Sequence, residues 1–138
     1  MRTFLDSGVL LAAWRGETLA AAALSIMSDD AREFVTSQLV RLELRPKARF
    51  ERRLIEVRFY ESHFAEAVAC EPLSEVLGNA AESLAARYGL SGADAVQVAA
   101  AIRQGAREFY TSERPGNPFF RVKELRVISL HALPAVGT

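Results

Sequence analysis

The stretch LSGADAVQVAAAIRQGAREFYTSE, residues 90–113, decides the fold class. Its middle part, AVQVAAAI, is nearly all small and apolar, which predicts a helix over 92–104 that is buried on most sides. The short apolar run REFYT, residues 107–111, has the length of a buried strand. A buried helix followed closely by a buried strand is typical of the units that build parallel sheets.

The same alternation continues outward from this stretch. Other short apolar runs predict strands, and the segments between them show helical periodicity. The further predicted strands are 2–5, 33–36, 66–70 and 125–130. The further predicted helices are 7–14, 17–30, 37–45, 47–64 and 73–89, with Pro46 separating the third helix of the chain from the fourth. Alternation with short connections predicts an α/β protein in which helices cover both faces of a parallel sheet.

Size and composition predict one globular domain over residues 1–138. Half of the residues are hydrophobic and 25% are charged, which argues against disorder or a fibrous repeat. The single cysteine excludes an internal disulfide, and with two histidines it gives no zinc-binding spacing. No apolar run approaches the ~18 residues of a membrane span, and Asp6 interrupts the run that a signal peptide would need. We therefore expect a cytoplasmic protein without a membrane segment.

Four acidic residues occupy positions where open parallel sheets bind ligands. Asp6 and Glu113 each follow a predicted strand, and ligands of such sheets bind beyond the carboxyl ends of the strands. Asp94 lies at the inner end of the buried helix, and Glu43 lies on the helix 37–45. Two carboxylates ~4 Å apart repel by about 4 kcal/mol at an effective dielectric of ~20, so such a group requires a cation. Ligand sets made only of oxygen favour Mg²⁺ or Mn²⁺.

Each acid also has an ordinary structural interpretation, and the sequence leaves both open. Asp6 stands where it would cap the following helix. Glu43 lies one turn before Lys47 and would pair with it. Asp94 fits the third position of a capping box, and Glu113 fits an exposed loop.

These segments together resemble the PIN-domain family of metal-dependent ribonucleases, particularly the toxin subunits of VapBC-type toxin-antitoxin pairs. FLDSGVLLAAW resembles the first family motif, SQLVRLELR the second, and residues 90–113 the third and fourth together. The likeness covers nearly the whole chain. By motif, Asp6, Glu43 and Asp94 match the three principal metal-coordinating acids of the family, and Glu113 falls where many members have Asp.

The resemblance implies a three-layer α/β/α domain with a central five-stranded parallel sheet. It also implies Mg²⁺ or Mn²⁺ in an acidic pocket, hydrolysis of RNA phosphodiester bonds, a homodimer and a protein antitoxin as partner. Asp6-Ser7-Gly8 departs from the usual Asp-Thr-Ser, and Glu113 is longer than Asp. An alternative function is therefore a PIN-fold binding module with little or no catalysis. Gly8 excludes a haloacid-dehalogenase-type phosphatase, which needs a second Asp at that position.

Two further sets of residues have both a functional and a structural interpretation. Ser7 and Thr111 are expected to orient the carboxylates, or to act as ordinary cap and turn residues. Between Arg41 and Arg58 the chain has seven basic and three acidic residues, which predicts either a surface that follows an RNA backbone or a solvated helix held by ion pairs. The candidate backbone contacts are Arg45, Lys47, Arg49, Arg52 and Arg53.

Overall fold

The computed structural model describes residues 1–134 and contains one sheet of five parallel strands. The strands are β1 (Arg2–Leu5), β2 (Glu33–Ser37), β3 (Ala69–Glu71), β4 (Glu108–Thr111) and β5 (Arg126–Ser129), in the order β3-β2-β1-β4-β5. The helices are α1 (Ser7–Arg15), α2 (Ala20–Met27), α3 (Gln38–Phe50), α4 (Leu54–Glu66), α5 (Glu75–Tyr88) and α6 (Gly92–Arg103), with short 3₁₀ helices η1 (Pro118–Arg121) and η2 (Leu130–Ala132).

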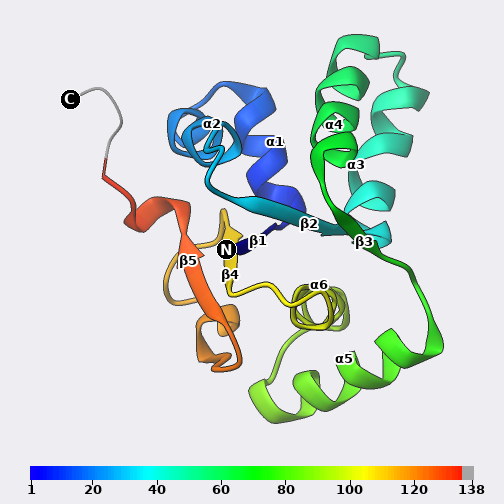
Figure 1. Ribbon diagram of the computed structural model, residues 1–138, viewed down its shortest axis with the longest axis vertical. Helices are drawn as coiled ribbons and strands as arrows, with labels where there is room; N and C mark the ends of the chain where they lie inside the picture. The colour runs from blue at the N-terminus through cyan, green and yellow to red at the C-terminus, as the bar shows by residue number, and fades with distance from the viewer. Residues whose placement is uncertain (135–138) are drawn as a thin grey trace.

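Helices cover both faces of the sheet. Figure 1 shows α1 to α4 on one side and α5 with α6 on the other. The predicted α/β/α fold with a five-stranded parallel sheet is therefore confirmed. Among residues 1–134, no single helix is both long and apolar enough to cross a membrane.

The strand order reverses its direction between β1 and β4, at the centre of the sheet. From β1 the chain steps outward to β2 and β3, and it then returns across the sheet to β4 and β5. The two central strands pair in register, with Phe4 opposite Phe109 and their rings stacked at 5.3 Å between centroids. The carboxyl ends of β1 and β4 therefore meet at the switch point of the sheet, where such folds bind ligands.

The predicted helix break at Pro46 is wrong. Pro46 lies inside α3, which continues to Phe50. Proline removes one helical hydrogen bond, the one that would reach the carbonyl of Leu42, and Leu42 is on the exposed side of the helix. The buried stripe of Val40, Leu44 and Ala48 continues through the proline, and its packing holds the helix together.

The third strand was predicted too early in the chain. Residues 66–70 were expected to form it, but α4 continues to Glu66 and β3 begins only at Ala69. The periodicity of a short apolar run does not distinguish the end of a buried helix from a buried strand. The second predicted helix, 17–30, is also shorter than expected, because only Ala20–Met27 is helical.

The buried face of α4 carries a histidine whose ring makes no hydrogen bond within residues 1–134. His63 is 2% exposed, its ring lies edge-on to Phe34 at 5.5 Å, and neither ring nitrogen has a hydrogen-bond partner. Burial lowers the pKa of His63 from 6.5 to about 4, because the charged form would lose its hydration. The folded protein therefore holds this side chain in its neutral form.

Acid is expected to destabilise the protein through His63. Between pH 6.5 and about 4 the unfolded chain binds a proton that the folded chain excludes, so stability falls as the pH falls through this window, by up to about 3 kcal/mol. His63→Leu removes the titrating group at a similar volume. Urea unfolding at several pH values should show the wild type losing stability relative to His63→Leu below pH 6.5. A difference that stays constant from pH 8 to pH 4 would contradict this prediction.

Candidate functional site

Asp6 joins the central strand to the first helix. Its backbone amide donates to the carbonyl of Tyr110 at 3.1 Å, which extends the pairing of β1 with β4. Its side chain accepts from the amide of Val9 at 3.1 Å, so Asp6 is the N-cap of α1, as one of its two interpretations predicted. The side chain is nevertheless 7% exposed, which is more burial than a surface cap requires. Capping alone does not account for this position.

The carboxyl group of Asp6 lies in an unfavourable electrostatic environment. Burial raises its pKa from 3.8 to about 7, and the charges of Glu113 and Asp94 raise it further. Hydrogen bonds from Thr111 and from the Val9 amide lower the pKa of Asp6, but by less than burial raises it. Glu113 and Asp94 are therefore both close enough to repel the charge of Asp6, and for Glu113 this agrees with the pairing of β1 with β4.

Glu43 is held in place by two hydrogen-bond donors. The Ser7 hydroxyl donates to its Oε1 at 3.1 Å, and Nε2 of Gln97 donates to the same oxygen at 2.7 Å. Gln97 is itself fixed, because the buried Ser37 hydroxyl donates to its Oε1 at 3.0 Å. Among residues 1–134 no ion pair joins Glu43 to Lys47, so the simple surface-pair interpretation of Glu43 is wrong.

Asp94 and Glu113 are the other two acids of the group. Asp94 comes from α6, and Glu113 comes from the loop after β4. The Ser91 hydroxyl accepts from the amide of Asp94 at 3.3 Å and caps α6, while the Asp94 side chain lines the pocket. The backbone of Glu113 is fixed at both ends: its amide donates to Thr111 Oγ1 at 3.1 Å, and its carbonyl accepts from Ser129 at 2.6 Å. The side chain of Glu113 is left at the exposed edge of the pocket.

All four predicted acids line one cavity of about 230 Å³ at the switch point of the sheet. Within the described part of the chain, none of the four has a Lys, Arg or His partner within 4.0 Å, although nine ion pairs form elsewhere. Over the same residues, no three His, Cys, Asp or Glu side chains are close enough to form a metal-binding group as they stand. The donor set itself, four carboxylates without nitrogen or sulfur, suits Mg²⁺ or Mn²⁺.

Several residues of the pocket were not assigned a role from the sequence. Gln97, Ser112, Ala93 and Phe119 line the cavity beside the acids. The single polar side chain in the apolar run AVQVAAAI was a usable signal for Gln97. No local pattern marks Ser112, whose role follows from its contact with Gly8. A Cβ atom on Gly8 would collide with the Ser112 hydroxyl oxygen and would lie 3.3 Å from Oδ1 of Asp6.

Three of the five candidate RNA-contacting residues on α3 and in the following turn have carboxylate partners. Arg49 pairs with Glu61 of α4 at 2.7 Å, and Arg45 reaches the same carboxylate at 3.9 Å. Arg53 pairs with Glu51 at 3.0 Å. These pairs join α3 to α4 and to the turn between them. An RNA-binding role of Arg45, Lys47, Arg49, Arg52 and Arg53 stays a prediction.

Comparisons with known proteins agree with this architecture. The family model of the PIN domain matches residues 3–122. Three similar solved structures are VapBC2 from Rickettsia felis bound to a promoter DNA fragment, a toxin-antitoxin complex from Klebsiella pneumoniae, and the sarcin-ricin loop cleaving toxin VapC20 from Mycobacterium tuberculosis. A search of curated proteins finds no match.

The structural likeness extends over nearly the full length of the proteins compared. The TM-scores are 0.68, 0.69 and 0.65, at sequence identities of 13%, 16% and 18% in the same order. The alignments cover 94%, 93% and 90% of this chain and 98%, 97% and 98% of the others. At these identities the three structures show a common fold.

Proposed function

This chain belongs to the PIN-domain family, and from that premise we propose that it is a metal-dependent ribonuclease and the toxin subunit of a toxin-antitoxin pair. One observation carries the proposal: four carboxylates line one pocket at the switch point of the sheet, and none has a cationic partner among residues 1–134. Asp6 is buried at the base of this pocket beside other acids and without a compensating cation, which destabilises the protein, so its presence points to a cation acquired during function.

In this proposal Asp6, Asp94 and Glu113 hold one or two Mg²⁺ or Mn²⁺ ions, with Glu43 binding directly or through water. A divalent ion supplies Lewis-acid polarisation of a phosphate and activation of a water nucleophile at neutral pH. The protein holds the carboxylates in a fixed orientation. Ser7 and Gln97 fix one oxygen of Glu43, and the cap of α1 fixes one oxygen of Asp6.

The phosphodiester substrate and the protein partner are inferred from different observations. RNA is proposed because the family resemblance implies hydrolysis of RNA and because VapC20, a structural neighbour, is described as cleaving the sarcin-ricin loop. An antitoxin partner is proposed because VapBC2 and the Klebsiella structure are described as toxin-antitoxin assemblies. A homodimer and a cytoplasmic location complete the proposal.

The test is cleavage of a panel of structured RNAs by the purified protein. We expect cleavage with millimolar Mn²⁺ or Mg²⁺, loss of cleavage with EDTA, and recovery when Mn²⁺ is added back. Equal cleavage with EDTA and with Mn²⁺ would contradict metal dependence. RNA binding without cleavage at every metal concentration would instead support the alternative function, a PIN-fold binding module.

A further inference from the structure

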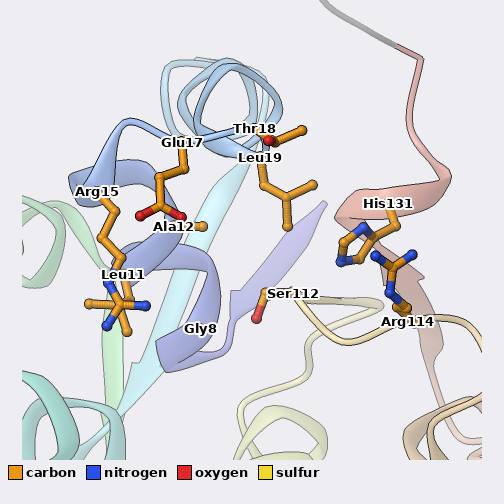
Figure 2. Close-up of a pocket in the computed structure, with 10 residues that line it drawn as sticks. All are labelled: Gly8, Leu11, Ala12, Arg15, Glu17, Thr18, Leu19, Ser112, Arg114 and His131. Carbon is orange, nitrogen blue, oxygen red and sulfur yellow. The ribbon is translucent and has the colours of Figure 1, made fainter.

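A second and larger cavity lies beside the acidic pocket. Its volume is about 400 Å³, within the range of roughly 300–1,000 Å³ that is usual for small-molecule sites. Figure 2 shows it between α1, the loop before α2, the loop after β4 and the 3₁₀ helix η2. The four acids of the proposed metal site do not line it. It is therefore a separate cavity with its own chemistry.

The two cavities share a wall. Gly8 and Ser112 line both of them. Because Gly8 has no side chain, the backbone of α1 and the Ser112 hydroxyl form this wall together. The two cavities are therefore adjacent, and a polymer that binds the acidic pocket has a path into the larger cavity.

Charge is distributed unevenly around the larger cavity. Arg114 and His131 lie side by side on one wall, and Arg15 and Glu17 lie on the opposite wall (Figure 2). Within residues 1–134, neither Arg114 nor Arg15 has a carboxylate within 4.0 Å, in contrast to the paired arginines of α3. The Arg114 wall is thus an exposed cationic surface next to a pocket whose charged residues are all acidic.

We infer that this cavity binds the nucleotide next to the scissile phosphate of an RNA strand, with its phosphate against Arg114 and His131. The inference rests on the proposed function. A guanidinium donates two parallel hydrogen bonds to a phosphate, which makes an unpaired arginine a suited partner. The opposite wall carries Glu17 as well as Arg15, so its net charge favours phosphate less than the Arg114 wall does, and the sugar and base face its apolar side chains, Leu11 and Leu19.

The test measures RNA binding apart from cleavage. The parent protein is Asp94→Asn, which is expected to bind RNA without cleaving it. The probe is a short fluorescent single-stranded RNA, and its binding is measured by fluorescence anisotropy at several salt concentrations. Arg114→Gln and His131→Gln are introduced into this parent. The control is Lys123→Gln, which removes an exposed positive charge that lines neither cavity.

We expect Arg114→Gln to weaken RNA binding about tenfold and to lower the salt slope of log K by about 0.7, the value for one lost phosphate contact on a single strand. His131→Gln is expected to weaken binding by a smaller factor, and Lys123→Gln to change neither quantity. In the cleaving protein, Arg114→Gln should raise KM more than it lowers kcat. Such a pattern would not follow from a merely structural role of Arg114.

The outcomes separate this inference from the proposed function. If the wild type cleaves RNA but Arg114→Gln and His131→Gln bind with the affinity and salt slope of the control, the inference is wrong and the nuclease stands. If the wild type cleaves nothing but Arg114→Gln still weakens binding, the cavity binds RNA and the nuclease proposal is wrong. An Asp94→Asn parent with no measurable RNA affinity also overturns the inference.

Discussion

Asp94→Asn is expected to reduce metal-dependent RNA cleavage by more than about 100-fold while the protein keeps its fold. Loss of a residue that only supports a metal ligand typically costs about 10- to 100-fold, so loss of a charged ligand should cost more. Asparagine has the same shape and leaves the backbone amide bonded to Ser91, which caps α6 independently of the side chain. Initial cleavage rates in Mn²⁺, with circular dichroism as the check on folding, measure the effect.

Glu75→Gln is the matched control for this variant. Glu75 is in the first turn of α5, as Asp94 is in the first turn of α6, so both changes remove an acid that interacts with a helix N-terminus. Only Asp94 lines the acidic pocket. We expect Glu75→Gln to cleave as the wild type does. An Asp94→Asn protein as active as the wild type would remove the proposed metal site.

Asp6→Asn is expected to stabilise the metal-free protein at pH 8 and to abolish most of its response to Mn²⁺. The folded-state pKa of Asp6, about 7, lies above the ordinary 3.8, so ionising this group destabilises the fold as the pH rises between these values. At pH 8 this cost is at most about 4 kcal/mol, and at pH 5 it is less than half of that. Asparagine carries no charge and is an equally good N-cap, so it keeps the bond to Val9.

Thermal unfolding with EDTA at pH 8 and pH 5 measures this effect. At pH 8 the variant should unfold on the order of 10 °C higher than the wild type, and the difference should shrink at pH 5. Millimolar Mn²⁺ should raise the Tm of the wild type through linkage and raise that of Asp6→Asn much less. If both proteins have the same Tm in EDTA at both pH values, the buried charge of Asp6 does not destabilise the fold.

The sequence predicted the positions of the site better than its contacts. Asp6 and Glu113 were expected to face each other if their strands were neighbours, and β1 does pair with β4. Strand alternation and the rule for parallel sheets predicted that both acids follow the carboxyl ends of strands, but the strand order that makes β1 and β4 neighbours came from the structure. Whether the four acids hold a metal ion stays a prediction.

The remaining details depend on tertiary packing, which no local pattern encodes. The hydrogen bonds from Ser37 through Gln97 to Glu43 join α6, β2 and α3, and they exist only once those elements pack. The helix through Pro46 is a second example, because a buried apolar stripe outweighed a local helix-breaking signal. The functional meaning of Ser112 likewise required knowledge of its distance from Gly8.

The contact between Gly8 and Ser112 predicts how this site can change during evolution. A side chain at position 8 would occupy the present place of the Ser112 hydroxyl, so both side chains fit only if that hydroxyl turns away from the wall between the cavities. Homologues with a hydroxyl-bearing residue at position 8 should therefore favour glycine or alanine at position 112. Such covariation between the first motif and the loop after β4 would divide close homologues into two groups, each with one side chain at the wall between the cavities.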